Sequence, residues 1–180
     1  MNLTTNEIKK NLLFYFLYSR DFLCATTEMS IFNGSYLADI VALSKNYKFY
    51  EVEIKTNTSD LKKELESVKQ IISKNKSFDK FLSKYSKHFG YLNFKHEKTY
   101  FVPHRFYFSI TYKDKDFALD ALLDSPYGLM DHHGNIYKKA KDLHNEKVSE
   151  IFIKKLLQRI SRVNYNLMNK DAEEKNIRTI

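Results

Sequence analysis

The chain has 180 residues, of which 43% are hydrophobic and 29% are charged, so we expect one folded domain with a substantial core rather than a disordered chain. Its formal net charge of +8 suits a polyanionic partner such as nucleic acid or an anionic membrane face, although many basic proteins bind neither. The single cysteine, Cys24, excludes an intramolecular disulfide and fits a reducing compartment.

The N-terminal segment is expected to form a helix. Thr4 and Glu7 have the spacing of a capping box, and the helix should continue to about Tyr18. The apolar run at 12–17 is too short to span a bilayer, and no small-residue cleavage site follows it. We therefore expect a cytoplasmic protein with no membrane partner.

Two strand-like segments, 22–32 and 37–43, flank an Asn33-Gly34 turn, which is a strong signal for a β-hairpin. The second segment is apolar almost throughout, as in a strand buried on both faces, except for Asp39. An ionised carboxylate there needs a partner or a metal to offset its desolvation. Glu28, on the first strand, either reaches the same site or faces solvent.

The next strand is predicted at 49–55. Alternation along it places Glu51, Glu53 and Lys55 on one face, so Asp39, Glu53 and Lys55 could share one small volume. Mg²⁺ prefers oxygen ligands and usually takes only one or two protein carboxylates. Lys55 could orient or deprotonate a water, or stabilise charge on a scissile phosphate. A Glu-x-Lys on a strand taken alone is more often a solvated cross-strand pair.

A helix should begin among the N-cap residues at 56–60, with an apolar stripe formed by Leu61, Leu65, Val68 and Ile72. Its opposite face carries Lys62 and Lys63. These lysines could contact a DNA backbone, although a solvated helix face is the default interpretation of such charges. The Lys-rich segment 73–98 is interpreted as an inserted helix or helical hairpin.

The remaining segments continue the mixed α/β pattern. Strands are predicted at 105–110, 127–130 and 136–138, with a short helix at 117–123 and a long amphipathic helix at 146–167. Residues 171–180 are interpreted as a frayed tail. His132 and His133 fall in a turn without a further ligand at suitable spacing, so we interpret them as loop residues rather than metal ligands, and His144 as structural.

Asp39, followed after thirteen residues by Glu53-Ile54-Lys55, resembles the signature of the PD-(D/E)XK nuclease superfamily, with Ala38 in place of the motif's proline. Other segments resemble the MmcB-type family of inferred DNA-repair endonucleases and related phage and prophage proteins. These segments are Ala38–Leu43, Val52–Thr56, Ser59–Leu61, Lys95–Glu97, Pro103–Phe108, Tyr127–Met130, Lys138–Ala140 and Leu143-His144.

The resemblance implies a restriction-endonuclease-like fold, with a mixed central sheet flanked by helices and carrying the Lys-rich insertion, as a single domain over 1–170. It implies a Mg²⁺- or Mn²⁺-dependent deoxyribonuclease that acts on DNA in repair, recombination or phage DNA processing. Many superfamily members also carry a metal-site Glu on the first helix, but the capping role accounts fully for Glu7.

The same resemblance implies the roles of individual residues. Asp39, Glu53 and the carbonyl of Ile54 would be metal ligands, Lys55 the catalytic lysine and Glu28 an outer member of the catalytic set. Lys95-His96 would begin a helix near the site and contribute to DNA binding together with Lys62 and Lys63, although a surface pair at the edge of the insertion explains Lys95-His96 as well.

Two other functions are compatible with the sequence. A DNA-binding module of the same fold could lack catalysis, although such a module has no need of Asp39, Glu53 and Lys55 together. A binder of anionic membranes or proteins would use the Lys-rich helices. If the protein makes two cuts on a duplex, a homodimer is favoured.

Overall fold

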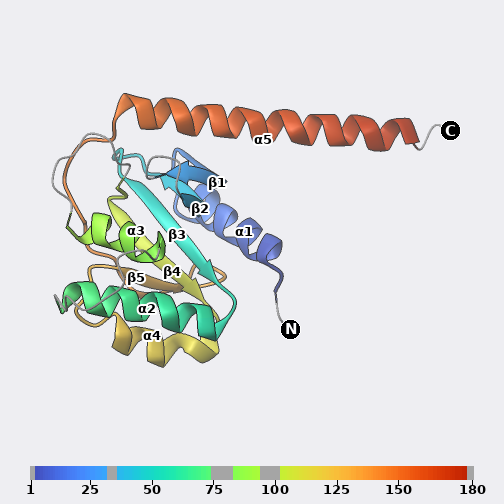
Figure 1. Cartoon of the computed structure of the whole chain (residues 1–180). Helices are drawn as coiled ribbons and strands as arrows, with labels where there is room; N and C mark the ends of the chain where they lie inside the picture. The colour runs from blue at the N-terminus through green and yellow to red at the C-terminus, as the bar shows by residue number, and fades with distance from the viewer. Residues whose placement is uncertain (1–2, 32–35, 74–82, 94–101, 178–180) are drawn as a thin grey trace. The chain divides into compact units, whose positions relative to one another are not determined.

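The computed structural model describes residues 3–31, 36–73, 83–93 and 102–177. It divides into two compact units, Met1–Lys147 and Val148–Ile180, and each is described by itself. All of the described residues predicted for the active site lie in the first unit. Figure 1 labels the helices and strands used below.

The first unit is built on a six-stranded sheet with the strand order β1-β2-β3-β4-β5-β6. β3 pairs in parallel with β4 and β4 with β5, whereas the other neighbours are antiparallel. This mixed sheet, flanked by helices, confirms the predicted α/β class. The strands are β1 (Cys24–Ile31), β2 (Tyr36–Leu43), β3 (Phe49–Lys55), β4 (Arg105–Ile110), β5 (Gly128–Asp131) and β6 (Ile136–Lys138).

One face of the sheet packs on the N-terminal helix. The predicted capping box is present, because the Thr4 side chain accepts from the Glu7 N–H while Glu7 accepts from the Thr4 N–H. Helix α1 (Thr5–Phe14) continues into a π-helical turn, η1 (Tyr15–Ser19). The hydrophobic core on this face consists of Ile8, Leu12, Phe16, Ile40, Ala42, Val52, Ile54, Tyr107, Met130 and Ala140.

Three further helices belong to the first unit: α2 (Thr58–Ile72), α3 (Ser83–Leu92) and α4 (Lys115–Ala121), the last preceded by a short 3-10 turn, η3 (Tyr112–Asp114). Helix α2 lies between α3 and α4 and contacts both (Figure 1). Parallel strands need a crossover connection, and α2 and α3 lie in the one between β3 and β4.

The segment 73–98, predicted as an inserted helix or helical hairpin, lies in this crossover. Its described part is helix α3, which supplies the buried residues Lys87, His88 and Tyr91 to the interior. An added surface hairpin would have no need to bury a lysine and a histidine. Helix α3 is therefore an integral part of the fold.

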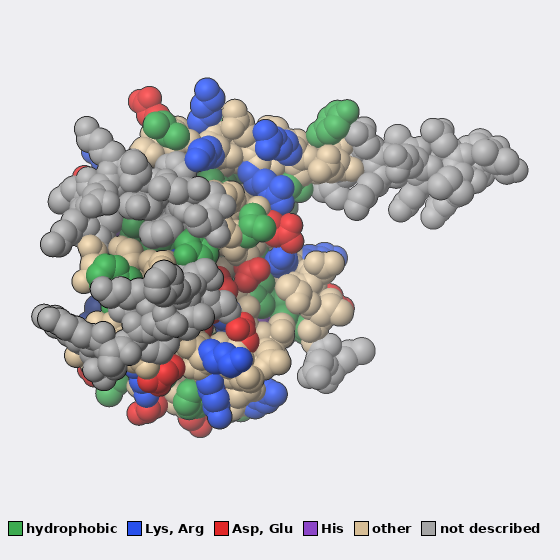
Figure 2. All heavy atoms as spheres, viewed as in Figure 1, with side chains coloured by type: hydrophobic (Ala, Val, Ile, Leu, Met, Phe, Trp, Pro, Cys, Tyr) green, Lys and Arg blue, Asp and Glu red, His purple; other side chains and the backbone are tan. Residues whose placement is uncertain are grey.

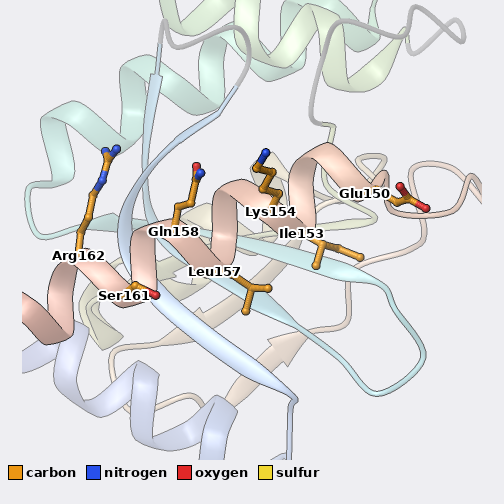
Figure 3. A pocket seen from close by; sticks show the side chains of 7 residues that line it. All are labelled: Glu150, Ile153, Lys154, Leu157, Gln158, Ser161 and Arg162. Carbon is orange, nitrogen blue, oxygen red and sulfur yellow. The ribbon is translucent and has the colours of Figure 1, made fainter.

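The second unit contains helix α5 (Glu150–Ile177), which begins four residues later than expected and extends through most of the predicted frayed tail. No glycine or proline occurs after residue 147 to end it. Side chains of α5 line a shallow hollow, and Figure 3 shows Lys154, Gln158 and Arg162 pointing away from Ile153 and Leu157. Among the described residues, no helix is long and apolar enough to cross a membrane.

Candidate active site

Asp39 lies where the pairing of β2 with β3 ends. The register runs from Leu43 opposite Phe49 to Ile40 opposite Val52, and beyond it the Asp39 Oδ2 accepts a hydrogen bond of 2.8 Å from the Ile54 N–H. The carboxylate thus takes the place of a backbone carbonyl. Burial raises the pKa of Asp39, the Ile54 N–H lowers it, and the nearby charge of Glu53 raises it further.

Glu53 and Lys55 lie on the same face of β3, as strand alternation predicts. Lys55 Nζ donates to Glu53 Oε1 at 2.8 Å, and its side chain is only 3% exposed. It also contacts Asp60 Oδ2 at 3.0 Å and Glu64 Oε2 at 2.6 Å, both on α2. Lys55 is therefore held by three carboxylates at the junction of β3 and α2.

A second buried lysine completes this group. Lys87 of α3 donates to the other oxygen of Glu53, Oε2, at 2.9 Å, and lies 3.6 Å from Glu51 Oε1 and 3.7 Å from Glu64 Oε1. Both oxygens of Glu53 therefore accept from a lysine. We use the name buried ionic cluster for Glu51, Glu53, Lys55, Glu64 and Lys87.

Aromatic side chains and a histidine close the cluster on the inside. His88 lies 2.9 Å from Glu64 Oε1 through Nε2 and 3.1 Å from the Tyr127 hydroxyl through Nδ1. The Tyr91 hydroxyl donates to Glu51 Oε2 at 2.6 Å. The rings of Phe106 and Phe108 pack against His88, and the Lys87 ammonium faces the ring of Phe106. Water is excluded from this side, which strengthens each charge interaction.

Charge pairing decides the protonation states. Burial alone would lower the pKa of Lys55, but Glu53 and Glu64 raise it well above its ordinary range, and Glu53 and Glu51 do the same for Lys87. Burial raises the pKa of Glu53, but Lys87 and Lys55 outweigh it and leave the pKa lowered. Lys55 is therefore a fixed cation near neutral pH. This favours the charge-stabilising role among the two predicted for it.

Glu51 behaves differently from its neighbours. Burial raises its pKa to about 7, although Lys87 and the Tyr91 hydroxyl pull it down. An unfolded Glu titrates near ~4.3, so between these values the folded chain keeps a proton that the unfolded chain releases. The contribution of Glu51 to stability is thus complete at acid pH and is lost as the pH rises to about 7.

Glu51→Gln should remove this pH dependence, since Gln cannot ionise and can still accept from Tyr91. As the pH rises from 5 to 8, the wild type loses the stabilisation from Glu51 and the variant does not. We therefore expect the free energy of unfolding of the variant, relative to that of the wild type, to be about 2 kcal/mol higher at pH 8 than at pH 5. Urea unfolding at the two pH values measures the difference. If the free energies of unfolding of the variant and the wild type differ by the same amount at both pH values, Glu51 is ionised throughout this pH range.

Glu28 is exposed on β1. It would stand opposite Asp39 in the β1–β2 register, but its φ of 53° takes it out of the pairing. Its carboxylate binds Lys9 Nζ at 2.9 Å, and Lys9 lies 3.8 Å from Asp39 Oδ1. Glu28 also lines an open groove of about 460 Å³ between α1 and β1. Lys9 thus links it to Asp39, and Glu28 is an outer neighbour of the site.

The residues predicted to bind DNA are only partly described. Lys62 and Lys63 are exposed on α2, and Lys62 Nζ lies 5.3 Å from the centre of the Phe117 ring. Over α2 and α4, at the bottom of Figure 2, basic and acidic side chains are interspersed. Lys95 and His96 lie outside the described residues.

His132 and His133 lie in the turn between β5 and β6, as predicted. Asp131 Oδ1 holds this turn by accepting from the N–H groups of His133 and Asn135. His132 is buried, and its Nδ1 lies 2.9 Å from the Ser109 hydroxyl, whereas His133 contacts Asn11. His144 binds the Val102 carbonyl through Nε2.

The donor set for a metal is limited. Among the described residues, no group of three or more His, Cys, Asp or Glu side chains is arranged to hold a metal ion. A hard cation such as Mg²⁺ needs only one or two carboxylates, and Asp39 is close enough to Glu53 that the charge of Glu53 raises the pKa of Asp39. These two residues fit the chemistry of Mg²⁺ or Mn²⁺, although the oxygens of Glu53 are already bound by lysines.

Sequence reasoning missed Glu64, Lys87 and His88. Glu64 falls at helical spacing between Leu61 and Val68, so the sequence places it in the apolar stripe of α2, and its burial could have been predicted. In α3 the polarity of the residues does not predict their burial. The apolar Phe89 is 50% exposed, whereas its polar neighbours Lys87 and His88 are buried.

The fold and the site together define an α/β protein that holds a buried ionic cluster against a six-stranded mixed sheet. No protein-family model matches the chain, and no curated protein matches it in sequence. A solved structure is similar to it: the SPO1766 protein of unknown function from Silicibacter pomeroyi, with a TM-score of 0.57 and 12% sequence identity. The match covers 97% of this chain and 96% of that one, and at this identity it bears on the fold alone.

Proposed function

We propose that the protein is a metal-dependent DNA endonuclease with a restriction-endonuclease-like fold of the PD-(D/E)XK type. The observation that carries the proposal is the convergence of Asp39, Glu53 and Lys55. Asp39 binds the backbone of β3 one residue beyond Glu53, and Lys55 lies 2.8 Å from the Glu53 carboxylate. Repair, recombination or phage DNA processing would be the setting.

In this proposal Asp39, Glu53 and the carbonyl of Ile54 hold Mg²⁺ or Mn²⁺. When bound, the metal supplies a Lewis acid for a phosphoryl oxygen and lowers the pKa of a water. The protein's own contribution is electrostatic. Lys55 is a cation that Glu53, Asp60 and Glu64 hold in place, so it can stabilise charge developing on the phosphate without reorganising.

One observation favours a second candidate, a DNA-binding module that does not cut. Each oxygen of Glu53 already accepts from a lysine, so the carboxylate is neutralised without a metal. A site of this kind could keep its structure while catalysis is absent. The two candidates differ in whether a divalent cation is required for any activity on DNA.

Asp39→Asn is the variant that tests the proposal, because the amide oxygen can still accept from the Ile54 N–H while the negative charge is lost. The purified protein would be incubated with linear, nicked, single-stranded and branched DNA, with Mg²⁺, Mn²⁺ or EDTA. We expect metal-dependent cutting by the wild type, and a rate at least about a hundredfold lower for Asp39→Asn.

Glu66→Gln is the matched control, since Glu66 is an exposed carboxylate on α2 and should cut like the wild type. If the wild type binds these DNAs but cuts none of them with either metal, the non-catalytic module is the better description. Undiminished cutting by Asp39→Asn would remove Asp39 from the site.

A further inference from the structure

Lys87 lies among three carboxylates inside the protein. Its Nζ is 2.9 Å from Glu53, 3.6 Å from Glu51 and 3.7 Å from Glu64, three carboxylates from β3 and α2. Its side chain is 4% exposed, and the ring of Phe106 covers it at 5.1 Å. Proteins also use carboxylates to bind hard divalent cations.

The geometry sets Lys87 in competition with a cation on Glu53. Lys55 binds Oε1 and Lys87 binds Oε2, so a divalent cation that takes this carboxylate competes with two ammonium groups for its oxygens and its charge. Lys55 is held by two further carboxylates at 3.0 Å or less, Asp60 and Glu64. The other contacts of Lys87 with carboxylates are longer, at 3.6 and 3.7 Å. Lys87 is therefore the easier of the two to displace.

We infer that Lys87 is a positioning residue of the site: it is the built-in counter-ion of Glu53 and yields that carboxylate when a divalent cation binds. The inference rests on the proposed function only in taking Glu53 as a metal ligand. It also explains why a lysine is buried on α3. Without it, the ionised Glu53 and Glu64 would outnumber Lys55 inside the protein, and uncompensated buried charge is strongly destabilising.

Lys87→Met combined with Glu51→Gln tests the inference at pH 8, where Glu51 is ionised, because the pair then removes one positive and one negative charge and leaves the net charge of the cluster unchanged. Mn²⁺ binding to the metal-free full chain would be measured by titration calorimetry without DNA. We expect the double variant to bind Mn²⁺ about ten- to hundredfold more tightly than the wild type, the factor that corresponds to one hydrogen bond between charged groups. Adding Glu53→Gln should abolish the gain.

Lys69→Met, at an exposed position on α2, is the matched control and should leave Mn²⁺ affinity unchanged. Equal affinity of the double variant and the wild type overturns the inference, as does a gain that survives Glu53→Gln. Because the readout is metal binding, a protein that shows the gain but cuts no DNA would retain this role for Lys87 and lose the proposed nuclease function.

A second measurement uses the wild-type chain and does not depend on how the variants fold. Acetylation of each lysine by acetic anhydride would be followed by mass spectrometry with and without Mn²⁺. We expect Mn²⁺ to increase the acetylation rate of Lys87 at least about threefold, since its ammonium loses its closest partner, Glu53, and is deprotonated more easily, and to leave that of Lys69 unchanged. An unchanged rate at Lys87 under saturating Mn²⁺ contradicts displacement.

Discussion

Lys55→Met is expected to abolish metal-dependent DNA cleavage, with a rate at least about a thousandfold below that of the wild type. The side chain is a cation held 2.8 Å from Glu53, so its loss removes a positive charge fixed beside the carboxylate proposed to bind the metal. Single-turnover cleavage of plasmid DNA with Mg²⁺ measures the effect.

This substitution will also weaken the fold, because it leaves Glu64 without the partner at 2.6 Å. Cleavage must therefore be measured well below the melting temperature of the variant. Lys55→Arg, which keeps the charge, separates the two effects, and Lys69→Met, on the exposed face of α2, controls for loss of a surface lysine. A folded Lys55→Met protein that cuts like the wild type would exclude Lys55 from catalysis.

The protonation of Lys55 also bears on the pH profile. Its pKa is raised above the ordinary lysine range by Glu53 and Glu64, so it remains protonated throughout the range in which cleavage would be assayed. Any rise of the cleavage rate with pH would then come from another group. This is the profile of an electrostatic stabiliser, whereas a lysine acting as general base needs a lowered pKa.

Local patterns were sufficient to predict the strands and the first part of the site. Asp39 was recognisable because it interrupts an apolar strand, and Glu53 and Lys55 because alternation places them on one face of β3. Even the capping role of Glu7 could be read from four neighbouring residues. Each of these features depends on contacts within one strand or one turn, or between adjacent strands.

The interior of the site depends on contacts that no local pattern encodes. Lys87 and Glu53 are 34 positions apart, and they meet only because the crossover brings α3 over β3. Hydrophobic periodicity favours burial of Phe89, yet the structure exposes it and buries Lys87, since three carboxylates compensate the lysine's charge. Propensity and amphipathicity carry no information about such pairing, so the burial of Lys87 could not be predicted from the sequence.

Glu64→Ala is expected to lower the free energy of unfolding by about 3–5 kcal/mol, the cost of breaking a buried ion pair from one side. Glu64 is fully buried, and it contacts Lys55 at 2.6 Å and His88 at 2.9 Å. These partners hold its pKa well below the ordinary range of a glutamate. Glu66→Ala, on the exposed side of the same helix, should change the free energy of unfolding by no more than about 0.5 kcal/mol.

A double-mutant cycle locates the cause of this loss. If Glu64 acts by neutralising Lys55, then Glu64→Ala combined with Lys55→Met should cost less than the sum of the single variants, with a coupling of at least about 1 kcal/mol in urea unfolding. Additive effects would instead assign the loss to a cavity around the methylene groups of Glu64. In that case Glu53 and Asp60 would hold Lys55 in position, and Glu64 would contribute to packing rather than to the charge balance of the site.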